Sequence, residues 1–256
     1  MEDDIRNTIK SRKSTLTASM VMTPTQREVP LGLAIRTVIL SVLPVWISLL
    51  SDLLSTTVTL FFLSRADSST AETTAGIGLG ITLNNCLLRT FILGYNVGMI
   101  TLVSQNMGKG NAAIVPEFLN RAILSGTVAL LFMGCIMVFI GFALDWIGIE
   151  KEAAKTCRIY TQITFGGFLF HCYYDAFRQY LNARGMFAIH FFVPAITMVI
   201  NGVGCYLLIL QANLGIEGAG ISMDIQMLSN FLIILLIAMC YTPARNSLRP
   251  FSAISF

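Results

Sequence analysis

Charged residues are scarce in this chain. Asp, Glu, Lys and Arg make up 12% of its 256 residues, whereas soluble domains carry about a quarter. Hydrophobic residues make up 55%, and the mean hydropathy is +0.72. A soluble chain this apolar would have to expose large hydrophobic patches, a difficulty that a surrounding lipid bilayer removes. The composition therefore excludes an ordinary soluble domain and predicts an integral membrane protein.

The sequence also lacks the marks of several function classes. A net charge of +3 is too small for the concentrated basic face of a nucleic-acid-binding protein. The six cysteines form no CxxC and no Cys/His metal spacing, so we expect neither a metal site nor a disulfide framework. HExxH, GxSxG and GxxxxGK[ST] are missing, which argues against a membrane-embedded enzyme. We expect no enzyme, no cofactor and no nucleic-acid partner.

Six apolar segments are long enough to cross a bilayer, which takes about 20 residues. They cover about 36–64, 75–103, 120–145, 158–181, 187–211 and 218–241. Lipid-facing backbone must satisfy its own hydrogen bonds, so all six segments must be helices. Pro44 predicts a bend in the first of them. The predicted fold class is all-α, with a six-helix transmembrane lobe over residues 36–241.

Polar tails flank the six segments, and residues 1–35 have the mixed polar composition of a disordered tail. Of the 17 Lys and Arg residues, Arg89 lies within a span. If the N-terminus is cytosolic, twelve others lie on the inner side and four on the outer side, namely Arg65, Lys151, Lys155 and Arg158. Positive charge favours the cytosolic side. We therefore expect both tails, 1–35 and 242–256, in the cytosol.

Ionisable residues inside a span cost at least a few kcal/mol, so they are functional candidates. Asp52 is the strongest, since a carboxylate that changes protonation could couple protons to transport; the alternative is structural pairing. Arg89 is the counter-ion of Asp52, a snorkelling cation or a substrate contact. Asp224, early in the sixth segment, is either solvated near the outer surface or buried for a function. Asp175 and Arg178, three residues apart, predict an interfacial ion pair.

Neutral polar side chains accompany these ionisable residues inside the spans. Thr59 lies in the first segment, Asn85 in the second and Asn201 in the fifth. They predict either helix–helix hydrogen bonds or the polar wall of a central cavity.

Two glycine pairs punctuate the second segment. Gly76 and Gly80 are four residues apart, and so are Gly94 and Gly98. This spacing places both glycines of a pair on one face, which permits the close approach of a neighbouring helix. We expect a close helix contact at each pair.

Three stretches carry motifs of a known kind. Residues 85–111, NCLLRTFILGYNVGMITLVSQNMGKGN, end in a pattern like G-x-x-x-A-x-x-T-x-x-S-Q-x-x-G. The matching residues are Gly94, Thr101, Ser104, Gln105 and Gly108, and Gly98 stands in place of Ala. Residues 179–185, QYLNARG, and 214–222, LGIEGAGIS, are similar to R-x-L-Q-A-Q-G and L-G-x-x-G-A-A-x-A. Together these stretches resemble the multidrug and toxic compound extrusion (MATE) family of cation-coupled antiporters.

The resemblance implies twelve helices in two six-helix lobes that rock around a central cavity. Such proteins export organic cations or other small amphipathic compounds in exchange for H⁺ or Na⁺. This chain would supply the first lobe, so its expected partners are the bilayer, a substrate of that kind, and a second lobe or a second copy. The alternatives are a non-transporting half-transporter that acts only by pairing with another lobe, and an unrelated six-helix channel.

The resemblance also bears on single residues. Thr59 stands where bacterial members carry an Asp late in the first helix. Asp52, about two turns earlier on the same face, could replace it as the titrating group. Asn85 and Asn201 fall where family members often have Asn. The resemblance thus implies an ion and substrate pathway past these positions, with Arg89 and Asp224 as further candidates.

Overall fold

The computed structural model describes residues 30–66, 70–111, 113–187 and 189–240. Contacts divide the chain into two units, 1–40 and 41–256. The described part of the first unit is helical from Leu31, and its described side chains are exposed. Most of the predicted tail at 1–35 and all of the tail at 242–256 lie outside the described residues. The helical bundle belongs to the second unit.

Every regular element in the described part of the chain is a helix. The elements are α2 (Leu31–Leu63), α3 (Ala71–Asn84), the π-helical turn η1 (Asn85–Arg89), α4 (Thr90–Gly108), α5 (Val115–Ile147), α6 (Lys151–Ala183), α7 (Ile189–Cys205), the π-helical turn η2 (Tyr206–Gln211) and α8 (Gly215–Cys240). α3, η1 and α4 form one rod, and α7 continues into η2. The prediction of an all-α membrane fold is confirmed, with one rod for each predicted segment.

Some helices extend beyond the predicted apolar segments. α6 begins at Lys151 rather than near 158, because Lys, Glu and Ala favour helix and continue it past the apolar stretch. α2 begins at Leu31, so residues 31–35 are helical rather than part of a disordered tail. Leu31, Leu33 and Ala34 favour helix, which outweighs Gly32 and explains the earlier start. Pro44 lies inside α2, which continues past it, and the bend there stays a prediction.

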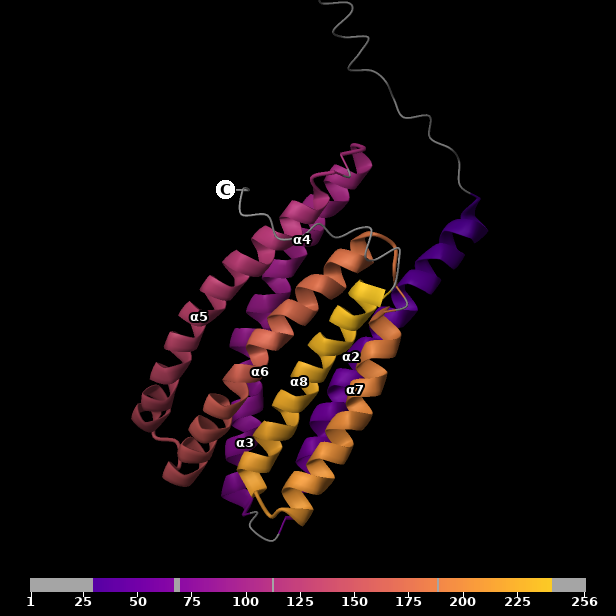
Figure 1. The fold of residues 1–256 in the computed structure, drawn as a ribbon. Coiled ribbons are helices and arrows are strands. Elements are labelled where there is room, and N and C mark those ends of the chain that lie inside the picture. Colours follow the sequence, from indigo (N-terminus) through magenta and orange to yellow (C-terminus); the bar gives the residue numbers. More distant parts are fainter. Residues whose placement is uncertain (1–29, 67–69, 112, 188, 241–256) are drawn as a thin grey trace, which may run out of the picture. The chain divides into compact units, whose positions relative to one another are not determined.

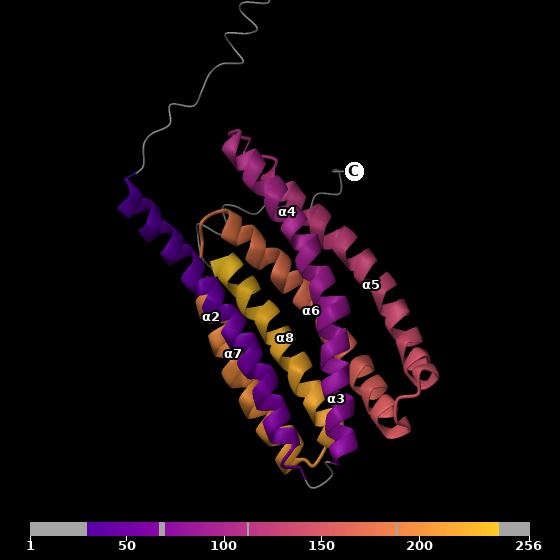
Figure 2. The same cartoon turned by 180° about the vertical axis from the view of Figure 1, so that it is seen from behind.

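Among the described residues, five helical rods are long and apolar enough to cross a membrane. They are α2, α3 with η1 and α4, α5, α7 with η2, and α8. α6 has 33 residues, so its length suffices, but it is less apolar. α6 contacts α5 and α8 on two sides (Figure 1) and the α3–α4 rod on another (Figure 2). Its buried polar side chains, among them Thr164 and Asp175, therefore meet protein, while the charged side chains of its first turns remain exposed.

The two glycine pairs of the α3–α4 rod have different surroundings. A Cβ atom added at Gly76 would lie 2.6 Å from a backbone oxygen of α6, and one at Gly80 would lie 2.9 Å from the Tyr160 ring. This confirms the close contact predicted there. At Gly94 and Gly98 an added Cβ would meet nothing within 4 Å. The described residues make no close contact at this pair, because its face points away from the neighbouring helices, so the contact that the spacing permits stays a prediction.

Apolar clusters hold α6 against its neighbours at two levels. One cluster packs Val103 of α4, Leu119 of α5 and Tyr180 of α6 together. Another packs Leu88 of η1 and Leu130 of α5 against Phe168 of α6. The first cluster also includes Val193 of α7 and Ile234 of α8, and the second includes Met227 of α8, so α6 is packed into the apolar core on several sides.

Candidate functional site

α2 carries its polar side chains inward and its leucines outward. Its buried polar residues recur every three or four positions, which places them on one helix face: Ser48, Ser51, Ser55 and Thr59. Its exposed positions include Leu49, Leu50, Leu53 and Leu54. This arrangement suits a helix that faces lipid on one side and other helices on the other. The polar interior of the bundle is therefore the candidate site.

An ion pair joins α2 to the π-helical turn η1. The guanidinium of Arg89 donates to the carboxylate of Asp52. The two side chains are 29% and 23% exposed, so the pair can be reached from the surface of the bundle. Of the arrangements predicted for Arg89, the one observed is the counter-ion of Asp52. A role of either residue in transport remains a prediction.

The π-helical turn sets the direction of Arg89. The backbone N–H and the hydroxyl of Thr90 both donate to the carbonyl oxygen of Asn85, five residues earlier. Such an insertion rotates everything that follows it, and π-bulges occur frequently at functional sites. Two predicted site residues, Asn85 and Arg89, form the two ends of this turn.

Thr59 and Asn85 line one small cleft between α2, the α3–η1 junction, α6 and α8. Asn84 and Thr164 line the same cleft, and the Asn84 amide donates to the Thr164 hydroxyl at 2.8 Å. The Oδ1 atom of Asn84 is buried and finds no hydrogen-bond partner among the described residues. The structure thus brings two of the predicted pathway residues to one polar wall.

Asn201 ties α7 to α2. It is fully buried, and its Nδ2 atom donates to the Ser55 carbonyl oxygen and the Thr59 hydroxyl, each at 3.2 Å. Gln226 of α8 donates to the Ser55 hydroxyl at 2.9 Å. The Sγ atom of Cys205 lies 3.5 Å from the Thr59 hydroxyl. These are helix–helix hydrogen bonds, one of the two arrangements predicted for the neutral polar residues.

A second ion pair, between Asp175 and Arg178 of α6, lies inside the helical bundle. Asp175 is 2% exposed and accepts hydrogen bonds from Arg178 Nε at 3.0 Å and Asn96 Nδ2 at 2.9 Å. Arg178 Nη1 donates to the Ser48 hydroxyl at 3.0 Å. The pairing was predicted correctly, and the structure buries it between helices; its depth relative to the membrane interface stays a prediction. Position along α6 did not disclose that neighbouring helices cover this end.

Asp224 stands apart from the other candidates. It is half-buried where α8 meets α6, and its Oδ1 atom accepts the backbone N–H of Gly167 at 3.2 Å. A Cβ atom at Gly167 would lie 2.2 Å from that oxygen, so only glycine permits the contact. Within the described part of the chain, no hydrogen bond or ion pair connects Asp224 to Asp52 or Arg89. Whether it is solvated near the outer surface or buried for a function stays a prediction.

Several polar residues of the interior were not singled out from the sequence, and four of them carry an amide or lie on α7. These four are Asn96, Thr197, Gln226 and Asn230, and the Thr197 hydroxyl donates to Asn230 Oδ1 at 2.8 Å. A usable signal was present, because Gln226 and Asn230 are four residues apart in an apolar helix. Thr197 and Asn201 repeat that spacing, which places both members of a pair on one face.

The motif residues of α4 form a stripe that faces away from the bundle. The α4 stripe consists of Gly94, Gly98, Thr101, Gln105 and Gly108, spaced alternately by four and three residues, with Ser104 beside it. All six residues are exposed. A Cβ atom added at any of the three glycines would meet nothing within 4 Å. Within this chain, the stripe has room for a close neighbour.

Comparisons with known proteins agree on one family. A model of the family described as MatE matches residues 44–207. Because this match covers more than half of the chain, the chain belongs to the MatE family. No protein of curated function matches it.

Solved structures share the fold. The eukaryotic MATE transporter AtDTX14 has a TM-score of 0.74 and 14% identity, over 82% of this chain and 46% of that one. A MOP superfamily transporter from Pyrococcus furiosus, for which a reversed polarity of the binding pocket is described, has a TM-score of 0.71 and 14% identity, over 80% and 44%. The Vibrio cholerae MATE transporter VcmN in the bent form has a TM-score of 0.71 and 15% identity, over 80% and 45%.

At these identities the likeness establishes the fold alone. The chain spans about half the length of the structures that it matches. Together with the apolar helices, the family and the fold make it an integral, multi-pass membrane protein.

Proposed function

We propose that this chain is one six-helix lobe of a cation-coupled antiporter, which exports organic cations or small amphipathic compounds by alternating access. The counter-ion is H⁺ or Na⁺, and both termini face the cytosol. The Asp52–Arg89 ion pair carries the proposal, because it places a carboxylate in a membrane helix where it can still be reached from the surface. Membership in the MatE family supports the transporter class.

The charge of the interior supports a cationic substrate. Among the described residues inside the bundle, the carboxylates of Asp52 and Asp175 are paired with Arg89 and Arg178, whereas a third carboxylate, Asp224, accepts only a backbone N–H. Three negative charges against two positive ones leave one unit of negative charge. In a low-dielectric interior, such a surplus attracts a cation strongly.

Competition at Asp52 gives a physical route to exchange. A proton that binds the carboxylate removes its charge and releases Arg89. An organic cation or Na⁺ that binds the carboxylate also displaces Arg89, but it requires the charge to be present. The proton and the cation cannot occupy the Asp52 carboxylate together, so the binding of one displaces the other when the lobe changes conformation.

A second lobe completes the proposed transporter. The α4 stripe supports this, because its glycines face outward with no atom in the way of another helix. Small residues permit close helix packing in lipid. A half-transporter that acts only by pairing is the second candidate, and the outward-facing glycines of the α4 stripe favour it over a lobe that acts alone.

Transport by reconstituted protein tests the proposal. Liposomes that contain the chain are loaded with a fluorescent organic cation, and efflux is measured under an inward proton or sodium gradient. We expect Asp52→Asn to abolish gradient-driven efflux, because the competing carboxylate is gone. Glu152→Gln is the matched control, since that carboxylate is 65% exposed on α6 and is paired only with Lys155.

The outcomes separate the candidate functions. Unchanged coupled efflux in Asp52→Asn contradicts the role of that residue. Efflux that requires a second six-helix lobe in the same membrane supports the half-transporter. Ion currents without exchange of the loaded cation support a channel and contradict antiport.

A further inference from the structure

One face of α6 changes from charged to apolar along its length. Lys151, Lys155, Arg158, Gln162 and Phe165 recur every three or four residues and therefore share a helix face. The first four are exposed, and Phe165 is half-buried. At about 1.5 Å per residue the face is about 21 Å long, which exceeds the roughly 15 Å of hydrocarbon in one leaflet. The face can therefore reach from the lipid headgroups into the acyl chains.

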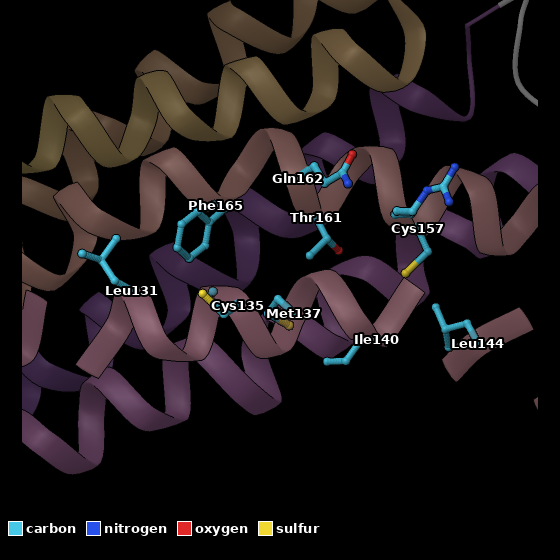
Figure 3. A pocket seen from close by; sticks show the side chains of 11 residues that line it. Leu131, Cys135, Met137, Ile140, Leu144, Cys157, Thr161, Gln162 and Phe165 are labelled. Atoms are coloured by element: carbon cyan, nitrogen blue, oxygen red, sulfur yellow. The ribbon is translucent and has the colours of Figure 1, made fainter. Parts of the chain in front are cut away.

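The apolar end of this face borders a groove between α5 and α6. The groove has a volume of about 400 Å³. Figure 3 shows Leu131 and Ile140 of α5 on one side and Phe165 of α6 on the other. A Cβ atom at Gly134 would lie 2.2 Å from the Phe165 ring, so the glycine lets this ring lie directly on α5. The volume falls in the usual range of small-molecule sites, about 300–1,000 Å³.

The charged end of the face borders a second hollow, of about 660 Å³, where α5 turns into α6. Arg158 lines both hollows, so they adjoin. Lys151 and Lys155 also line the second one, against a single carboxylate, that of Glu150. Lys155 has an exposed partner in Glu152 at 4.0 Å, whereas the described residues offer no ion pair to Lys151 or Arg158. The hollow therefore carries a positive surplus.

A tryptophan marks the depth of the charged hollow. Trp146, near the end of α5, is 92% exposed and lies two residues before Gly148, which lines the hollow. Tryptophan gathers at the level of the headgroups, where its ring has one apolar and one wet surrounding. The cations around Gly148 are thus placed at headgroup depth.

We propose that the α5–α6 groove binds an anionic phospholipid. Its phosphate lies among Lys151, Lys155 and Arg158, and one acyl chain lies in the groove beside Phe165. Charge complementarity selects this occupant, because a zwitterionic lipid lacks the net negative charge and an organic cation is repelled by the same three side chains. The site shares no residue with the Asp52–Arg89 pair, so it does not depend on the proposed transport function.

Tryptophan fluorescence offers a direct test, because the chain has only two tryptophans, Trp46 and Trp146. In a Trp46→Phe background, Trp146 alone reports on the groove. The full chain is placed in phosphatidylcholine nanodiscs that contain a minor fraction of brominated phosphatidylglycerol or brominated phosphatidylcholine. We expect stronger quenching by the anionic lipid, and Arg158→Gln should weaken its apparent affinity about fivefold.

Two further variants keep the test independent of folding. Arg65→Gln is the matched control, since Arg65 is a cation at the end of α2 whose guanidinium lies over the Phe61 ring, 4.3 Å from its centre. It should leave the quenching unchanged. Cys135→Phe fills the groove from an exposed position of α5 without changing any charge. It should reduce the preference for the anionic lipid as Arg158→Gln does.

Several results would overturn the proposal. Equal quenching by the two brominated lipids contradicts the selection for an anion, and an unchanged preference in Arg158→Gln contradicts the phosphate position. Sensitivity to Arg158→Gln without sensitivity to Cys135→Phe means that a headgroup binds without its acyl chain in the groove. Displacement of the anionic lipid by tetraphenylphosphonium assigns the groove to a lipophilic cation instead.

Discussion

Replacing Asp175 by Asn tests the buried ion pair of α6. The substitution keeps the shape of the side chain but removes the negative charge, while Arg178 stays 13% exposed and charged. Breaking a buried pair by removing one partner costs about 3–5 kcal/mol, because the remaining charge has no compensation. The surroundings support the full effect, since Asn96 and Ser48 supply hydrogen bonds but no charge.

The effect is large enough to measure by heating. For a chain of this size each kcal/mol shifts the melting temperature by about 2–4 °C, so Asp175→Asn should lower it by about 6–20 °C. The assay is the fraction of folded protein that survives heating in mild detergent, measured by size-exclusion chromatography. Glu152→Gln should cause little change, because an exposed ion pair contributes little.

A second variant separates charge from packing. Asp175→Leu combined with Arg178→Met removes both charges and keeps similar volumes, so it should restore much of the stability. If Asp175→Asn is as stable as Glu152→Gln, or if the double variant is no more stable than Asp175→Asn, the pair does not act through uncompensated charge.

Two glycine substitutions test close contacts, each against a matched control. Gly167→Ala should lower the free energy of unfolding by about 1–3 kcal/mol through overpacking, since its Cβ would lie 2.2 Å from Asp224 Oδ1. At Gly166 the nearest atom would be 3.9 Å away, so Ala should be tolerated there. Equal effects at the two positions would contradict the tight contact. Gly98→Leu should abolish pairing with a second lobe or copy, which chemical crosslinking in membranes measures. Gly78→Leu on the same rod should not, although its added Cβ also meets no described atom within 4 Å. Unchanged crosslinking in Gly98→Leu would exclude the α4 stripe as the pairing face.

The helices were predictable because a backbone that crosses lipid must satisfy its polar N–H and C=O groups internally, as a helix does. What hydropathy could not find was their ends. α6 continues to Lys151 through residues that favour helix yet are not apolar, and the length of an apolar run reports only the part of a helix that lies in lipid. α6 was predicted as a span although it is less apolar than the other rods, and a helix packed against protein on several sides can cross a membrane with fewer apolar residues than one that faces lipid.

The site was only partly predictable. Two opposite charges in apolar spans must be neutralised, so the Asp52–Arg89 pair could be anticipated as one alternative. The burial of Asp175 depends on α2 and α4 covering that end of α6, and no local pattern records this. The π-helical turn at Asn85–Arg89 was also invisible, because its letters, NCLLR, are those of an ordinary helix.

The α3–α4 rod gives a reason for a second lobe that does not rest on resemblance. A glycine inside a helix costs about 1 kcal/mol relative to alanine. Gly76 and Gly80 offset that cost, because they let α6 approach to distances that a Cβ atom would forbid. Gly94 and Gly98 have the same spacing on the same rod, but nothing in the described chain approaches them. A helix packed against the α4 stripe would offset that cost, so we expect a second lobe or copy to pack on this exposed side of α4.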